Sequence, residues 1–435
     1  PIMFTSKSFF PFIEGIKPTG RRLTPLCRFY LQKSDDVKLH SVVENSVDKT
    51  PMTAQLWQMR HNNPGPSKSN NSKNEAMRVL TTKNVKESRQ TLRYNFRSDA
   101  MLHDLYVDHR GNVLIGRLFE DLDALAGSIA FSHCGNSDPN VPSRLSLVTA
   151  SVDKIIQSKA ISVANDIVVI GQVAFVGKSS LDIAIEIHTA DDSDHIPPIV
   201  TYSKSKLLSS IFTFVARDKD TGKAATINRL SLDTKEEEEL AATRAAIASN
   251  RKLALSAEHD KHQHCGEVIR QLIDAGSVIE DMPALAHSNA VLMKLTNLEN
   301  SFICQPQNVN LGGRVFGGFM MHRAFDLAIA TCYTFAGTYP VFQQVDKIVF
   351  RKPVDIGDLV RMKSRVVYTY NGPIRSAVHV EVSAQVVRPE RASSFVSNTF
   401  HFVFGFNDNV ALRKVLPLTM EEAAALVSSS TSYHH

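Results

Sequence analysis

The segment 308–321 reads NVNLGGRVFGGFMM and carries the most specific chemical signal in the chain. Two adjacent glycines, Gly317 and Gly318, open a stretch of helical character, so a ligand can approach the backbone closely there. Amides at a helix start have no partner within the helix, and the helix dipole makes that end positive. The pattern indicates a site that polarises a carbonyl oxygen, and a simple tight turn at a helix entry is the alternative interpretation.

Acidic side chains interrupt two apolar helical stretches. Asp326 follows Gly318 by about two turns among apolar neighbours. We expect a desolvated carboxylate with a raised pKa, suited to general acid or base chemistry. An acid that only pairs with a base or caps a neighbour is the alternative. The first stretch carries Glu120, Asp121 and Asp123, of which we expect at least one to be catalytic and the others to be solvated.

The chain repeats itself. SVDKIIQSKAI at 151–161 matches QVDKIVFRKPV at 344–354, at an offset of 193 residues. Two further matches follow in the same order, 166–189 with 358–384, each reading as two strands around a glycine-containing turn, and FTFV at 212–215 with FHFV at 400–403. An internal duplication is the simplest explanation.

A helical segment precedes each VDKI strand, at 116–134 and at 317–335. Both open on glycine and are apolar on most faces, as a helix buried on nearly all sides would be. Each half therefore reads as a short strand, a glycine-containing loop, a long central helix and three or four strands. This order predicts an α+β fold of two tandem units, each an antiparallel sheet wrapped around a central helix.

This duplicated arrangement, with NxxGxVFGGFMM before a buried helix, resembles the double hotdog acyl-coenzyme A thioesterases, and within them the mitochondrial thioesterase 9 group. The resemblance spans about 91–415. Its motifs in the first half are GRLFEDLDAL at 116–125, VTASVDKI at 148–155, FVGKSS at 175–180 and VARD at 215–218. Those in the second half are SNAVLM at 288–293, FGGFMM at 316–321 and FRKPV at 350–354.

The resemblance implies hydrolysis of acyl-CoA thioesters to free fatty acid and CoA, at the interface of the paired hotdog units and without a cofactor beyond the CoA of the substrate. It also implies a catalytic Asn on the loop before one helix and an acid on the partner helix. Counting six residues back from Phe316 places this Asn at Asn310, and the same count from Ile115 gives His109. We therefore favour Asn310 acting with Asp123.

Asp326 is the matching acid of the second helix and would face the altered His109 loop. The resemblance further implies that the amides of Gly317 and Gly318 bind the developing oxyanion. Candidate ligands of the CoA phosphates are Lys347, Arg351 and Lys352, for which ordinary surface charge is the alternative.

Two other functions remain open. His322 lies four residues before Asp326, which allows an acyl-thioester dehydratase of the hotdog class. The His109 departure allows a non-catalytic protein that binds or senses acyl-CoA. Metal binding has little support, because the five cysteines form no CxxC pair and His262, His264 and Cys265 lack a second ligand pair.

Charge is distributed unevenly along the chain. Residues 1–90 hold 15 Lys and Arg against 7 Asp and Glu, which leaves 34 against 37 for the remainder. The acid-poor, Arg-containing leader predicts an organelle transit peptide, with a disordered tail as the alternative, and the family implies mitochondria. The net acidic body disfavours a nucleic-acid partner. No apolar run reaches the roughly 18–20 residues that a membrane-spanning helix needs.

The predicted organisation follows from these patterns. We expect a homo-oligomer, by resemblance. The intervals are a basic leader with a flexible segment at 1–90, a first hotdog domain at 91–232, a charged helical linker at 233–284, a second hotdog domain at 285–415 and a C-terminal tail at 416–435.

Overall fold

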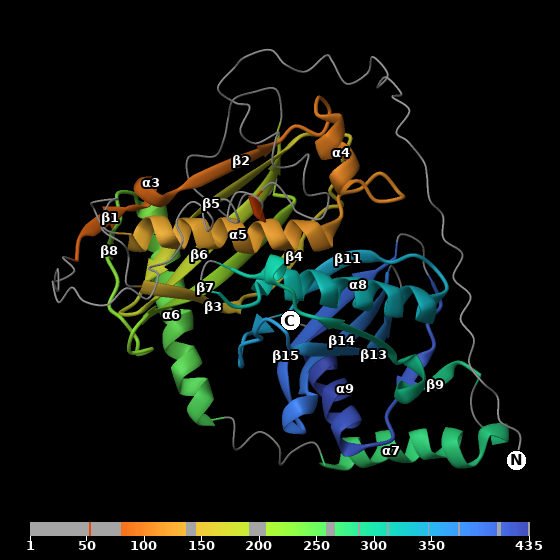
Figure 1. The fold of residues 1–435 in the computed structure, drawn as a ribbon. Helices are drawn as coiled ribbons and strands as arrows, with labels where there is room; N and C mark the ends of the chain where they lie inside the picture. The colour runs from red at the N-terminus through yellow and green to blue at the C-terminus, as the bar shows by residue number, and fades with distance from the viewer. Residues whose placement is uncertain are drawn as a thin grey trace, which may run out of the picture.

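The structure is a computed structural model that describes residues 52–53, 80–135, 145–190, 206–257, 266–285, 288–310, 313–346, 348–372, 375–406 and 410–433. The predicted transit peptide, the segment 61–75 and the His262–Cys265 group lie outside the described residues. Within them, two hotdog units of the same design lie side by side, as predicted (Figure 1).

The first unit is built around helix α5 (Ile115–Cys134). Most of its side chains are buried, because strands pack on one side of it and the second unit on the other. Its other elements are β1 (Thr82–Asn84), α3 (Val85–Ser88), β2 (Gln90–Tyr94), α4 (Ala100–Tyr106), β3 (Leu145–Val152), β4 (Ile155–Gln157), β5 (Ile167–Val176), β6 (Ser180–Thr189), β7 (Leu208–Asp218) and β8 (Arg229–Ser231).

The second unit is built around helix α8 (Gly317–Ala336), which ends at Gly337 in the left-handed conformation, with φ of 68°. Glycine adopts that backbone conformation without a steric penalty, so the chain can turn sharply into the next strand. The other elements are β9 (Ala290–Leu292), β10 (Leu298–Ile303), β11 (Val341–Val345), β12 (Ile348–Val349), β13 (Leu359–Asn371), β14 (Ser376–Arg388), β15 (Ser393–Gly405), β16 (Lys414–Leu416) and α9 (Met420–Tyr433).

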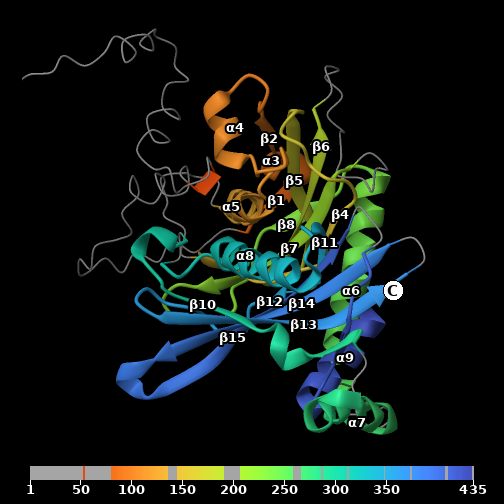
Figure 2. The same ribbon diagram turned by 90° about the vertical axis from the view of Figure 1, so that its right-hand side faces the viewer.

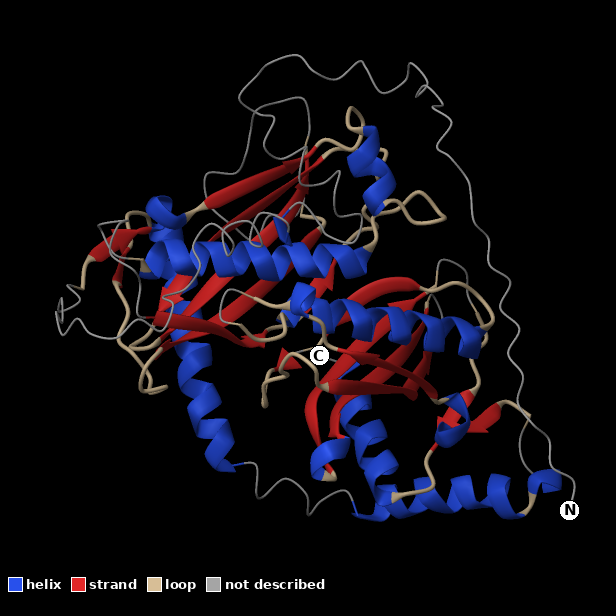
Figure 3. Cartoon of the chain, in the orientation of Figure 1, coloured by secondary structure: helices blue, strands red, loops and turns tan. Residues whose placement is uncertain are grey.

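The two units share one 12-stranded sheet, whose main path is β10-β13-β14-β15-β11-β4-β7-β6-β5-β2. The repeated VDKI motif forms the seam, because each copy pairs with the other. Ile348 lies opposite Val152 and Val345 lies opposite Ile155. All four side chains are at most 1% exposed, so the hydrophobic core runs without a break from one unit to the other. Figure 3 shows the strands fanning out behind the two central helices.

The strand register corrects one match made from the sequence. Val152 lies opposite Phe212, and the equivalent Val345 lies opposite Phe402. The partner of Phe212 in the repeat is therefore Phe402 rather than Phe400. The predicted hairpin is confirmed between β5 and β6, where the Gly177 amide donates to the Ser180 carbonyl across the turn.

Three helices lie outside the wrapped cores. Helix α6 (Lys235–Ala257) packs on the outer face of β5, and α7 (Gly266–Asp281) packs on α9, which in turn covers β13 (Figure 2). Helix α6 lies in the interval predicted as a charged helical linker, and one face of it is buried, because Leu240 and Arg244 pack against the sheet. Arg244 is held by two carboxylates of the first unit, Asp153 and Asp182.

The limits of the folded body differ from the predicted intervals at both ends. Strand β1 and helix α3 lie upstream of residue 91, where β1 pairs with β8 and α3 packs on α5. The interval predicted as a tail contains the helix α9.

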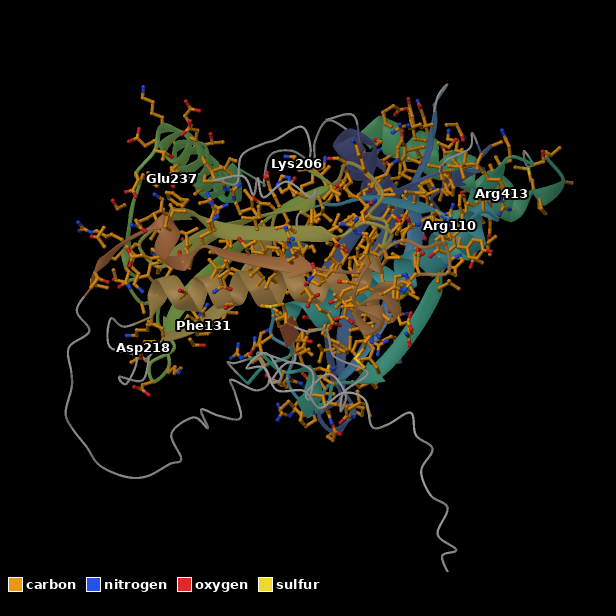
Figure 4. The ribbon with its side chains drawn as sticks, turned by 90° about the horizontal axis from the view of Figure 1, so that it is seen from above. Arg110, Phe131, Lys206, Asp218, Glu237 and Arg413 are labelled. Carbon is orange, nitrogen blue, oxygen red and sulfur yellow. The ribbon has the colours of Figure 1, made fainter. Side chains whose placement is uncertain are left out.

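Seen from above, Phe131 near the end of α5 and Glu237 on α6 lie toward one end of the molecule, and Arg110 and Arg413 lie toward the other (Figure 4).

Candidate active site

The two central helices meet at the start of α8. A Cβ atom placed on Gly318 would lie only 2.8 Å from the Cα atom of Glu120 on α5. At the corresponding point on α5, a Cβ atom on Gly116 would collide with the ring of His322 on α8. A side chain at Gly318 would meet the backbone of α5 and force the helices apart, whereas one at Gly116 would displace the His322 ring. This close approach brings the N-terminus of α8 against the acidic stretch of α5.

Asp123 lies at this contact and is 1% exposed. Its Oδ2 atom accepts a hydrogen bond of 2.7 Å from the amide of Gly318, and its Oδ1 atom accepts one of 3.1 Å from the hydroxyl of Thr149. Burial raises the pKa of Asp123 to about 6, and the two hydrogen bonds oppose that rise because they stabilise the charged form. The result is a buried carboxylate that is ionised near neutral pH and can accept a proton.

Thr149 was not singled out from the sequence, although a signal for it exists. Strand β3 buries Leu145 and Leu147 on its inner face, and alternation places Thr149 on that same face. A hydroxyl at an inward position of an apolar strand indicates a buried polar partner. That partner is Asp123.

Asn310 lies half-buried in the loop that leads into α8. The loop is closed by a bridge between Val309 and Val315, and the Oδ1 atom of Asn310 accepts a 3.2 Å hydrogen bond from the Arg314 amide. The geometry therefore holds Asn310 just before the helix end that contacts Asp123.

The first unit contains the same loop, and it identifies equivalent residues. A bridge joins Val107 and Val113, and the Oδ1 atom of Asp108 accepts a 2.8 Å hydrogen bond from the Asn112 amide. Both bridge positions lie 202 residues before those of the second loop. The equivalent of Asn310 is therefore Asp108, and the assignment of His109 is corrected. The count went wrong because the residue before α5 that matches Phe316 is Leu114, not Ile115.

The same offset shows what stands in place of Asp123 in α8. The equivalent residue is Phe325, and the structure thus corrects the pairing of Asp123 with Asp326. Thr149 is likewise matched by Phe342, because β3 and β11 align at Val152 and Val345. The rings of Phe325 and Phe342 pack edge to face with centroids 5.5 Å apart. An aromatic contact thus occupies the position where the first unit has its acid and hydroxyl.

The remaining helix acids have separate surroundings. The side chain of Asp326 is 50% exposed, lies 3.5 Å from Nε2 of His322, and has a pKa raised mainly by partial desolvation. Glu120 lies 2.7 Å from Nδ1 of the same histidine. Asp121 was expected to be solvated, but it is buried and accepts hydrogen bonds from the hydroxyls of two tyrosines. These are Tyr94, at 2.8 Å, and Tyr106.

An aromatic side chain that was not predicted from the sequence lies against the start of α8. The ring of Phe350 comes within 3.1 Å of a Cβ atom placed on Gly317, and the Phe350 amide donates to the carbonyl of Ala150, next to Thr149. Two of the predicted phosphate ligands, Arg351 and Lys352, follow Phe350 directly and are exposed. The third, Lys347, lies outside the described residues.

Neither a metal site nor a membrane-spanning helix is found among the described residues. Within the described ranges, no group of three or more His, Cys, Asp or Glu side chains is arranged to hold a metal ion. In the same part of the chain, no helix combines the length and the apolar character needed to cross a membrane.

Two helix-wrapping sheets joined edge to edge, with a buried carboxylate at the start of the partner helix, define a double hotdog protein. No family model matches the chain. Several curated relatives, however, are similar to it over most of its length. The chain is 43% identical over 360 residues to acyl-coenzyme A thioesterase 2, chloroplastic, of Humulus lupulus, a match covering 80% of each chain. It is 42% identical to acyl-coenzyme A thioesterase 4, mitochondrial, of the same plant, covering 86% of this chain and 71% of the relative.

The human acyl-coenzyme A thioesterase 9, mitochondrial, is 33% identical, covering 75% of this chain and 72% of that protein. The chain therefore belongs to the acyl-CoA thioesterase family. A solved structure, an apo-hexameric acyl-CoA thioesterase, matches with a TM-score of 0.31 and 22% identity over 40% of this chain and 98% of its own.

Proposed function

We propose that the chain hydrolyses acyl-CoA thioesters to free fatty acid and CoA at the site that contains Asp123. The observation that carries this proposal is the buried carboxylate of Asp123, held between the Gly318 amide and the Thr149 hydroxyl. A base whose pKa is about 6 is ionised at neutral pH and can still accept a proton during the reaction. Membership of the thioesterase family supports the same reaction.

In the proposed mechanism the carboxylate of Asp123 takes a proton from a water molecule, and the oxygen of that water attacks the thioester carbonyl. The carbon–sulfur bond then breaks, and the CoA thiolate leaves with the proton that Asp123 returns. Direct attack by the carboxylate, followed by hydrolysis of the anhydride, is the alternative course. Asn310, on the loop before α8, positions the water.

The amide of Gly317 is the proposed donor to the developing oxyanion. Gly317 is the first residue of α8, so its amide has no acceptor within the helix, and the positive end of the helix dipole favours negative charge there. The neighbouring Gly318 amide already donates to Asp123. The two amides, which were expected to act together on the oxyanion, thus take different roles in this proposal.

Arg351 and Lys352 are the proposed ligands of the CoA phosphates, together with Lys347. Support comes from their position, because they follow Phe350, whose ring packs on Gly317 at the site. The ammonium group of Lys352 lies 4.9 Å from the ring centroid of Phe395, which limits its freedom while leaving it exposed.

Three further proposals concern the whole protein. It needs no cofactor beyond the CoA carried by its substrate. It acts in mitochondria, which the basic leader and two relatives described as mitochondrial support, although another is described as chloroplastic. It forms a homo-oligomer, which sedimentation of the purified chain would test.

Product analysis in isotopically labelled water tests the function. Hydrolysis predicts stoichiometric thiol release and one labelled oxygen in the fatty acid. A change in acyl unsaturation without thiol would instead identify a dehydratase. Tight binding of acyl-CoA without thiol release would identify a sensor. Either of these two results would overturn the proposed function.

A further inference from the structure

Glu120 and His322 meet where the central helices cross. They occupy equivalent positions, because the offset of 202 that relates the two loops also relates these residues. The Nδ1 atom of His322 lies 2.7 Å from Oε1 of Glu120. The side chain of His322 is 22% exposed and that of Glu120 is 12% exposed, so water screens this contact only in part. The pair therefore joins α5 and α8 on the pseudo-symmetry axis of the molecule.

Both residues also touch the glycines that allow the helices to approach. The ring of His322 covers Gly116 at the start of α5, and the backbone at Glu120 contacts Gly318 at the start of α8. The Gly318 amide is the donor to Asp123. Any change in the spacing of the helices at this crossing therefore changes the length of that hydrogen bond.

Other charged groups face the pair from both helices. On α8, Asp326 lies 3.5 Å from Nε2 of His322, so the ring is placed between two carboxylates. Asp326 in turn interacts electrostatically with Arg323 on α8 and Arg117 on α5. His322 is thus oriented at both ring nitrogens, with Nδ1 directed at Glu120 and Nε2 toward Asp326.

We infer that His322 is a positioning residue: through its hydrogen bond to Glu120 it holds the Gly318 amide at bonding distance from Asp123. This inference rests on the proposed function, in which the carboxylate of Asp123 is the base. It goes beyond that proposal because His322 touches neither substrate nor Asp123.

The inference predicts a specific change in pH dependence. When His322 is lost, the hydrogen bond from Gly318 to the carboxylate weakens, and the ionised form of Asp123 loses a stabilising partner. The acidic limb of the kcat/KM profile then moves to higher pH. The loss of the ring and the loss of its hydrogen bond would look alike in this profile, so a variant that keeps a hydrogen-bond donor without the ring is needed.

The test compares three substitutions with one control. His322→Ala removes the contact, His322→Asn keeps an amide donor near the position of Nδ1, and Gly116→Ala displaces the ring without changing it. Gly127→Ala is the control, because Gly127 lies on α5 like Gly116. A Cβ atom placed on Gly127 would have its nearest neighbour, the Phe214 ring, at 4.0 Å. The readout is kcat/KM for an acyl-CoA between pH 5 and 8, together with the thermal unfolding temperature.

We expect His322→Ala and Gly116→Ala to lower kcat/KM at neutral pH by about tenfold or more, since misplacement of a catalytic contact by an ångström costs that much. Their acidic limbs should also move to higher pH, whereas His322→Asn and Gly127→Ala should follow the wild type. Loss of activity in His322→Asn equal to that in His322→Ala would overturn the inference, as would a wild-type profile for His322→Ala. Failure of the proposed function would appear separately, as an active Asp123→Asn enzyme.

Discussion

Asp123 and Phe325 occupy equivalent positions in the two central helices, and one of them is a buried acid while the other is a buried aromatic ring. Their strand neighbours differ in the same way, because Thr149 donates to Asp123 where Phe342 packs on Phe325. A duplicated fold thus carries a polar pair at one position and an apolar pair at the equivalent position. The predictions below follow from this asymmetry.

The rate of hydrolysis should depend on the ionisation of Asp123. Its pKa is raised to about 6 by burial, and the carboxylate is the form that accepts a proton. We therefore expect kcat/KM to rise with pH, about tenfold per pH unit below that value, and to level off above it. Steady-state thiol release across this range checks the prediction. A profile that falls as pH rises through 6 would contradict the role of a base.

Thr149→Val should shift that profile upward in pH. The substitution keeps the shape of the side chain but removes the hydroxyl that donates to Asp123. A hydrogen bond to a charged group contributes about 1.5–3 kcal/mol, so the acidic limb should move up by about one to two pH units and kcat/KM at pH 7 should fall by about two- to fifteenfold. Thr213→Val is the matched control, because its hydroxyl donates to Asp182 on the outer face of the sheet. Equal losses of activity in the two variants would speak against a role of Thr149 at the site.

Phe325→Leu should affect stability rather than activity. Phe325 packs against four aromatic rings of the core, with centroids between 5.5 and 5.9 Å away. Loss of the ring contacts should lower the free energy of unfolding by about 1–2 kcal/mol, measured by chemical denaturation. The kcat/KM value should stay near that of the wild type. A loss of turnover larger than the loss of folded protein would place this aromatic cluster in the catalytic machinery.

Ile348→Ala should destabilise both units together. Ile348 is 1% exposed at the seam, opposite Val152 of the other unit. A truncation of this kind costs about 2–5 kcal/mol in a packed core. Because the core is continuous, we expect one cooperative unfolding transition at a lower denaturant concentration. The neighbouring Val349→Ala, at a side chain that is 40% exposed, should cost much less. Two separated transitions in the wild type would show that the units unfold independently.

The sequence predicted the two-unit fold well because its signals are long and periodic. Two apolar helices that open on glycine, and a VDKI motif repeated at a fixed offset, specify the cores and the seam. Equivalence between the loops was harder to predict. The paired Gly317 and Gly318 offer two alignments with the single Gly116, and the loop bridges together with the contacts of Glu120 and His322 select Gly318.

The same limit applies to the acids of the first helix. Glu120, Asp121 and Asp123 are close in sequence, but the turn of the helix points them at a histidine, two tyrosines and a glycine amide, respectively. Sequence spacing does not show which neighbour lies on each side, because those neighbours come from other elements. The place of Phe350 beside Gly317 could not be predicted for the same reason.

The most direct test of the account compares Asp123→Asn with Asp326→Asn, two substitutions that remove a carboxylate without changing the size of the side chain. Thiol release from acyl-CoA should fall by about a thousandfold or more in Asp123→Asn, because the base is lost. It should stay within about twofold of the wild type in Asp326→Asn, whose side chain is 50% exposed and faces His322. Wild-type turnover by a folded Asp123→Asn enzyme would contradict the account.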